Sequence, residues 1–190
     1  MAKRVYFAFH YQDVIDFRAN VVRNHGLTKG VEKSGYFDAS IWEESKKKGE
    51  VALKRMINAE LEYTSVTVVL IGSQTYARRW VRYEIMKSAE RGNTMLGVQI
   101  NSIPGKDRLT KLAGPNPFQY LGVTISADGK RATPYEWDGS QWKLYSDLGA
   151  FALSEQPIAN RGKFFQLTQW IPVKDWVQHD GFNNFNTWIG

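Results

Sequence analysis

Trp80 and Glu84 stand four positions apart, just after the apolar run VTVVLI (66–71) and the short segment GSQTYARR. On a helix, two residues at this spacing share one face. A carboxylate placed there could act on a ligand bound at the end of the preceding strand. The structural alternative is a tryptophan that packs in the core and an acid that the helix dipole stabilises by about 0.3–1 kcal/mol. Spacing alone favours packing and capping.

Further polar and aromatic residues fall at the ends of the other expected strands. If the strands are parallel, their carboxyl ends lie along one edge of a sheet, where α/β proteins bind ligands. The candidates at this edge are Phe9, His10 and Tyr11 after the first strand, Asp38 after the second, and Ser73 and Tyr76 on the approach to the helix of Glu84.

Several common kinds of site are excluded by composition and spacing. The 190 residues include no cysteine, which excludes disulfides, thiolate catalysis and cysteine-based metal sites. The three histidines, His10, His25 and His179, have no metal-ligand spacing, so we expect no metal. The sequence contains no nucleophile elbow G-x-S-x-G, no Walker A pattern and no G-x-G-x-x-G.

The first hundred residues alternate between strand and helix patterns. Apolar and β-branched runs predict strands, and apolar residues at a period of three to four predict helices. Asp13 is the expected N-cap of the first helix. Expected strands cover 4–10, 35–40, 66–71 and 95–100, and expected helices cover 13–24, 50–62 and 79–91. This order predicts an α/β fold, with a parallel sheet covered by helices on both faces.

The second half has a different character. GPNPF (114–118) marks a boundary, and ADGK (127–130) and WDGSQW (137–142) each contain an Asp-Gly turn that predicts a β-hairpin. Aromatic residues crowd the last forty positions, and we expect them to pack this extension against the sheet. We therefore divide the chain into an α/β domain over 1–113 and a C-terminal extension over 114–190, packed on the same domain.

The net charge of +6 suits a nucleic acid or a phosphate-bearing small ligand. The basic clusters KKK (46–48) and RR (78–79) are short and lack interleaved aromatic residues, so a solvated surface is favoured over a nucleic-acid site. No apolar run reaches the roughly 18 residues of a membrane span, and the N-terminus lacks the pattern of a signal peptide. We expect a soluble, cytoplasmic protein.

Several motifs together resemble a TIR domain. FxFHYxD near the start, FDAS, and then VTVVLIGSQTYARRWVRYEI match its opening box and its strand–loop–helix box. The chain is also similar over nearly its whole length to the TIR-like proteins of the Thoeris antiphage-defence system, through WVRYEI, GPNPF…YLG, the YEW-DG hairpin and the DWV…DG…W ending. The resemblance implies a flavodoxin-like TIR fold with a central, mostly parallel sheet.

The resemblance also implies an activity. Catalytic TIR domains cleave the nicotinamide–ribose bond of NAD, and the Thoeris proteins form a cyclised ADP-ribose signal that activates a separate effector. The nicotinamide ring already carries positive charge, so no general acid is needed, and one carboxylate can stabilise the ribose cation. By resemblance Glu84 has this catalytic role, with Trp80 walling the pocket and Phe9, His10 and Tyr11 near the nicotinamide ribose. NAD is then the substrate, with no separate cofactor.

Some alternatives stay open. Arg78 and Arg79 either contact the pyrophosphate of NAD or are solvated surface residues. Loop 41–49 lacks the proline that TIR domains often carry there, which leaves its role open. TIR catalysis often needs assembly, so we expect a homo-oligomer on activation. The alternative function is a non-catalytic TIR-like interaction module, and a nucleic-acid binder ranks below both.

Overall fold

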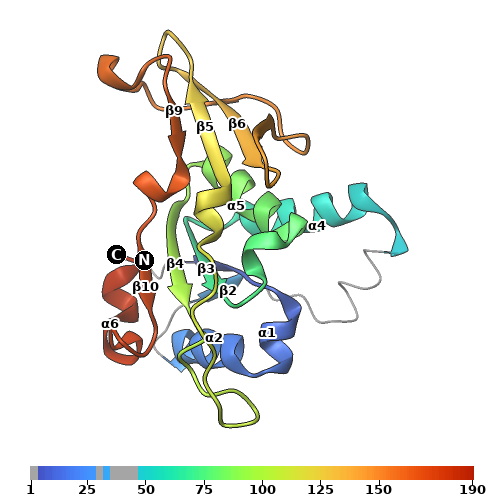
Figure 1. Cartoon of the computed structure of the whole chain (residues 1–190), viewed down its shortest axis with the longest axis vertical. Helices are drawn as coiled ribbons and strands as arrows, with labels where there is room; N and C mark the ends of the chain where they lie inside the picture. The colour runs from blue at the N-terminus through green and yellow to red at the C-terminus, as the bar shows by residue number, and fades with distance from the viewer. Residues whose placement is uncertain (1–3, 29–31, 35–46) are drawn as a thin grey trace.

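The computed structural model describes residues 4–28, 32–34 and 47–190. In this part of the chain, two sheets are stacked along the long axis of the molecule (Figure 1). The first is parallel and contains β1 (Arg4–Ala8), β2 (Glu32–Ser34), β3 (Val66–Ile71), β4 (Thr94–Gln99) and β10 (Val173–Asp175). The second is antiparallel and contains β5 (Leu121–Ile125), β6 (Arg131–Trp137), β7 (Trp142–Leu144), β8 (Phe151–Ala152) and β9 (Phe164–Gln166).

The parallel sheet has the order β10-β4-β3-β1-β2. This is the flavodoxin-like order 2-1-3-4-5, with β10 in the place of the fifth strand. The chain runs outward in both directions from the pair β1 and β3, so their carboxyl ends mark the switch point where such folds bind ligands. The predicted α/β class with a parallel sheet is confirmed.

Helices cover both faces of this sheet. One face packs on α4 (Glu50–Glu62) and α5 (Arg79–Arg91) through a core that includes Tyr6 and Ala8 of β1. The opposite face packs on α2 (Arg18–Thr28) and α6 (Gly181–Trp188) through a core that includes Val5 and Phe7. The alternation along β1 therefore decides that Tyr6 faces α5.

The predictions for β3, α4 and α5 are confirmed at their bounds, and β4 begins one residue earlier than expected. All six residues of β3 are buried, as a central strand between two helical layers requires. Helix α5 ends at Gly92, which adopts φ 74° and donates its N–H to the carbonyl of Ala89. A glycine in this left-handed conformation is a common end to a helix.

The single helix expected over 13–24 is wrong. The structure has α1 (Tyr11–Ile15) and α2, separated by Phe17 at φ 64°. The break turns Arg18 inward, where its buried guanidinium donates to the carbonyls of Ile103 and Leu109 at 3.0 and 2.7 Å. The N-cap of α1 is His10 and not Asp13. Periodicity of apolar residues could not reveal an arginine that is buried by bonds to a distant loop.

Two expectations fall on residues outside the described ranges. The strand expected over 35–40, with Asp38, is one of them, although β2 is found just before it at Glu32–Ser34. Most of loop 41–49 is the other, and description resumes at residue 47, ahead of α4.

The extension forms the second sheet and also completes the first. Both expected hairpins are confirmed: β5 pairs with β6 around 126–130, and β6 pairs with β7 around 138–141. After β9 the chain returns to the parallel sheet, where Val173 of β10 pairs with Gly97 of β4. Trp176 and Phe185 then bury their rings in the core beneath α2. The antiparallel sheet is thus an insertion between the fourth and fifth strands of the parallel sheet.

Candidate active site

Glu84 is a buried carboxylate on the inner face of α5, only 5% exposed. The Tyr6 hydroxyl of β1 donates a 2.6 Å hydrogen bond to its Oε1. Oε2 has no hydrogen-bond partner among the residues that the structure describes. Burial raises the pKa of Glu84 to about 8, and the hydrogen bond from Tyr6 opposes that shift. One oxygen is therefore held in place, while no donor to the other is found in the part of the chain that the structure describes.

The helix turn that carries Glu84 is also tied to the sheet. Ser88 Oγ donates to the Glu84 carbonyl at 2.7 Å and lies 2.8 Å from Thr67 Oγ1 of β3. Asn93, just before β4, donates to that same Thr67 oxygen at 3.2 Å. Thr67 pairs with Tyr6 across β1 and β3. Neighbouring strands thus fix both the side chain and the backbone of Glu84.

The three candidates at the end of β1, Phe9, His10 and Tyr11, lie in different surroundings. His10 is partly buried, and burial together with the positive charge of Arg78 lowers its pKa. Phe9 packs on the opposite face of the sheet from Glu84, with the Arg23 guanidinium 4.9 Å from its ring centre. Tyr11 is 45% exposed at the start of α1. His10 is therefore the residue of this group for which the structure shows an interaction with Arg78, the N-cap of α5.

Ser73 and Tyr76 line the loop between β3 and α5, as expected from their positions in the sequence. Ser73 Oγ accepts a 2.9 Å hydrogen bond from Asn101 Nδ2. The Tyr76 ring packs against that of Tyr120 in the extension, with ring centres 5.0 Å apart and the two planes tilted by 37°. The extension therefore packs against the loop between β3 and α5.

Trp80 packs, partly buried, against the same core cluster as Tyr6. Its ring meets Tyr83 edge-on, with centres 6.1 Å apart, and the Arg79 guanidinium lies 5.0 Å from its ring centre. Trp80 thus packs at the margin of the core that surrounds Glu84, and its predicted role as a pocket wall stays a prediction.

The two arginines before Trp80 differ in their surroundings. Arg79 pairs with Glu50 of α4 and donates to both oxygens of Asp147, at 2.8 and 2.9 Å. Arg78 is exposed, and its positive charge helps to lower the pKa of His10. Arg78 is therefore better placed than Arg79 to meet an anionic ligand.

Sequence reasoning missed three buried polar residues near this edge: Tyr6, Asp13 and Asn101. Asp13 Oδ2 and Asn101 Oδ1 have no hydrogen-bond partner in the described part of the chain. Asp13 lies against Gly72, and burial raises its pKa to about 6. A signal existed for Tyr6, because a tyrosine hydroxyl in a buried strand needs a partner.

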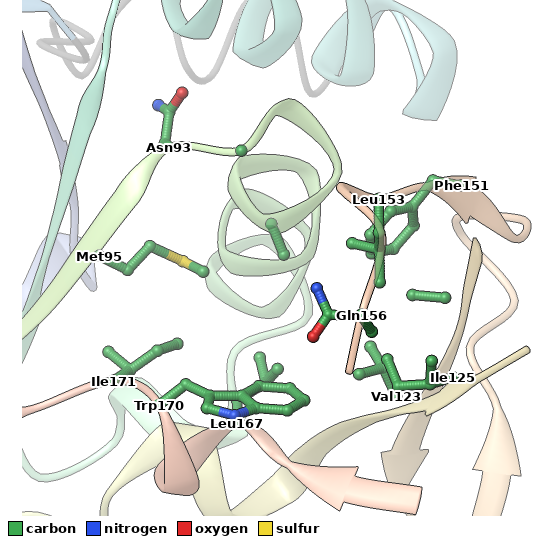
Figure 2. A pocket seen from close by; sticks show the side chains of 13 residues that line it. Asn93, Met95, Val123, Ile125, Phe151, Leu153, Gln156, Leu167, Trp170 and Ile171 are labelled. Carbon is green, nitrogen blue, oxygen red and sulfur yellow. The ribbon is translucent and has the colours of Figure 1, made fainter. Parts of the chain in front are cut away.

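A separate pocket of about 310 Å³ lies between the C-terminal part of α5 and the antiparallel sheet (Figure 2). Met95, Val123, Ile125, Leu153, Trp170 and Ile171 are among the apolar side chains around it. None of the predicted site residues lines it, and we do not place the chemistry there. Asn93, one of its lining residues, also donates to Thr67, which belongs to the hydrogen bonds that lead to Glu84.

Within the described ranges, no group of acidic or histidine residues is arranged to hold a metal ion. None of the helices described is both long and apolar enough to cross a membrane.

The doubly wound sheet of order 2-1-3-4-5 defines a flavodoxin-like α/β protein, and the helix after its third strand carries a buried glutamate, as expected of a TIR-like domain. A family model described as "Thoeris protein ThsB, TIR-like domain" matches residues 6–104. Over 191 aligned residues, which cover 100% of both chains, the sequence is 55% identical to a Bacillus cereus (strain MSX-D12) protein named "Putative cyclic ADP-D-ribose synthase ThsB1". The chain therefore belongs to the ThsB family of TIR-like Thoeris proteins.

Proposed function

We propose that this protein cleaves the nicotinamide–ribose bond of NAD and closes the remaining ADP-ribose into a cyclic signal for antiphage defence. The name of its Bacillus cereus relative supports this class of product. The catalytic role is assigned to Glu84 because of how its buried carboxyl group is held. Tyr6 donates to one of its oxygens, and the other has no donor among the described residues.

The chemistry needs one negative charge. When the glycosidic bond breaks, its electron pair moves to the cationic nicotinamide ring, which leaves neutral, and positive charge develops on the ribose. A preorganised carboxylate stabilises that charge most strongly where water is excluded. Glu84 lies in such a place, and burial raises its pKa, so its neutral form is favoured in the free protein more than that of an ordinary glutamate. The cationic nicotinamide ring favours the ionised form, so substrate binding and activation of Glu84 are coupled.

The remaining candidates supply the pocket. His10 follows β1, and Ser73 and Tyr76 follow β3, at the carboxyl edge of the sheet, while Trp80 borders the core cluster that contains Tyr6. We propose that these four residues contact the two riboses and the nicotinamide. Phe9, Tyr11 and Asp38 stay candidates by resemblance. Cyclisation requires a nucleophile from the substrate itself and exclusion of water. The reaction uses NAD as substrate with no separate cofactor.

The cyclic product acts on a separate effector as a diffusible signal, in the cytoplasm, and the protein assembles into a homo-oligomer when it is activated. The lack of cysteine in the sequence is compatible with a reducing compartment.

The test compares wild type with Glu84→Gln. Both are incubated with NAD in extract from phage-infected cells, and the products are resolved by mass spectrometry. Wild type should release nicotinamide and a cyclic ADP-ribose species, and Glu84→Gln should release at least a hundredfold less, as expected for loss of a charge-stabilising group. Equal product from both would overturn the role of Glu84. If defence persists in cells that carry Glu84→Gln, the protein acts instead as a non-catalytic interaction module.

A further inference from the structure

We propose that Tyr6 is the residue that positions Glu84 for catalysis: it holds Oε1, so that Oε2, which is buried and has no hydrogen-bond partner among the described residues, is the oxygen that stabilises the ribose cation. This inference rests on the proposed function and adds a residue to it. Tyr6 lies in the first strand, far from the strand–loop–helix box that carries Glu84 and Trp80. It is a positioning residue, because it acts through the carboxylate and not on the substrate.

The geometry leaves Tyr6 little freedom. Its side chain is fully buried in the core between β1 and α5, and its hydroxyl donates to Glu84 at 2.6 Å. A short bond from a neutral donor to a carboxylate is among the stronger hydrogen bonds in proteins. The strand neighbour of Tyr6, Thr67, belongs to the hydrogen bonds that fix the backbone of Glu84. The donor and the acceptor therefore sit on elements that are themselves connected.

A buried carboxylate without that bond would have two equivalent oxygens, and no hydrogen bond from Tyr6 would select one orientation of the group. With Tyr6 in place, one orientation is selected, and the lone pairs of Oε2 have no protein donor in the described residues. That is the arrangement that electrostatic catalysis needs, because a group already oriented in the free enzyme does not have to reorganise during the reaction.

The hydroxyl also keeps its proton over the working pH range. Burial and the negative charge of Glu84 raise the pKa of Tyr6 well above 10.0, so it stays a donor. Tyr6 of β1 and Glu84 of α5 shift each other's pKa. Among the described residues, the other titratable group that acts on the pair is Glu60 of α4, whose negative charge raises the pKa of Tyr6. The hydrogen bond favours the ionised form of Glu84, whereas burial opposes it. Removing the hydroxyl should thus make Glu84 harder to ionise.

Tyr6→Phe deletes this hydroxyl and no other atom. The matched control is Tyr83→Phe, which deletes a hydroxyl on the residue next to Glu84 whose partner is Asn58 at 3.0 Å. For Tyr6→Phe, we expect kcat at pH 7 to fall about tenfold to a hundredfold, as for loss of a bond to a charged group. KM should change much less, and the acidic limb of the pH profile should move to higher pH. Tyr83→Phe should keep the wild-type profile.

A second measurement does not depend on activity. In the full-length protein labelled with ¹³C at glutamate carboxyls, the Glu84 signal is the one missing from Glu84→Gln. It should titrate at higher pH in Tyr6→Phe than in wild type, and at unchanged pH in Tyr83→Phe. If Tyr6→Phe does not fold, 3-fluorotyrosine in place of Tyr6 tests the same bond, because its more acidic hydroxyl should move the titration to lower pH.

The outcomes separate the two proposals. If Glu84→Gln is inactive but Tyr6→Phe keeps the wild-type pH profile and Glu84 titration, the role of Tyr6 is wrong and the proposed function stands. If Glu84→Gln is as active as wild type, the proposed function fails at Glu84, and the role of Tyr6 fails with it.

Discussion

Tyr6 and Glu84 are 78 positions apart in the chain, yet the hydroxyl of one lies 2.6 Å from the carboxylate of the other. The bond crosses from the first strand of the parallel sheet to the helix after its third strand, inside a core of apolar side chains. A carboxyl group in such a place is easier to bury as the neutral acid, which makes the stability of the fold depend on pH.

Glu84→Gln should reduce that pH dependence. The pKa of Glu84 is about 8 in the folded protein, against an ordinary value of 4.5. Between these values the folded state holds a proton that the unfolded state has lost, so the free energy of unfolding decreases as pH rises from about 5 to 8. Glutamine cannot ionise, and the variant should gain on the order of a few kcal/mol relative to wild type at pH 8.

The measurement is urea unfolding at pH 5, 6.5 and 8. The pKa of Asp13 is raised to about 6, so its ionisation also lowers the free energy of unfolding as pH rises toward 6. The two proteins are therefore compared above pH 6. Glu155→Gln, at an exposed position, is the control and should follow the wild-type curve. Parallel curves for wild type and Glu84→Gln would contradict the assignment of a raised pKa to Glu84.

Arg78→Ala should raise the pKa of His10. The positive charge of Arg78 disfavours the charged imidazole, and removing it relieves that effect. NMR titration of the His10 ring measures the change directly. If Arg78 also meets the pyrophosphate of NAD, the same variant should raise KM for NAD by about tenfold, as for loss of one exposed charged contact.

Arg79→Ala is the control for Arg78. Arg79 is already paired with Asp147 and Glu50, so its removal should cost about 1 kcal/mol of stability without moving the His10 titration. An unchanged pKa of His10 in Arg78→Ala, or an equal change in both variants, would show that the two arginines are not distinguished as the structure indicates.

Gly114→Ala should disturb the loop that covers the carboxyl edge of the sheet. A Cβ at this glycine would lie 2.0 Å from the backbone carbonyl oxygen of Gly72, next to Ser73. Backbone on both sides must move apart, so we expect a loss of stability of about 2–3 kcal/mol and lower activity through displacement of Ser73. Gly149→Ala introduces the same methyl group where no atom lies within 4 Å, and it should be close to neutral. The measurements are the thermal unfolding and the NAD cleavage of the two variants. Equal stability and equal activity of Gly114→Ala and Gly149→Ala would refute the close packing over Gly72.

A chain that ends at residue 113 should not fold as an independent α/β domain. It would lack β10, the parallel partner of β4, and it would lack Trp176 and Phe185, which fill the core on the α2 side. It would also lose Phe118 and Leu121 from the core on the α5 side. Losing buried aromatic residues costs about 3–5 kcal/mol each, which exceeds the stability margin of most domains. Circular dichroism and urea unfolding of this truncated chain are the measurement, and a cooperative transition like that of the full chain would contradict the prediction.

Several elements could be predicted from the sequence at their bounds because the forces that set them are local. The run VTVVLI is short, rich in β-branched residues and apolar on both faces, as a covered central strand requires. The apolar period of α5 and its terminal Gly92 are equally local, as are the Asp-Gly turns of the two hairpins. The position of Glu84 at the start of a helix after a buried strand followed from the same reasoning, and the family resemblance then supplied the expected chemistry.

The features that the sequence did not predict depend on contacts between distant parts of the chain. Apolar periodicity extended one helix through Phe17, whereas the structure breaks there because Arg18 finds carbonyl partners more than eighty positions away. The fifth strand of the parallel sheet could not be located either, because VKD in the extension becomes a strand only when β4 offers its free edge.

The sequence by itself determined the class of fold, the order of its first strands and helices, and the glutamate to test, since each depends on side-chain pattern within a few turns or on a family motif. The tertiary structure decided what surrounds that glutamate: the hydroxyl of Tyr6, the burial that raises its pKa, and the β10 edge that completes the sheet. These depend on which residues meet across the core, and that is settled only when the whole chain packs.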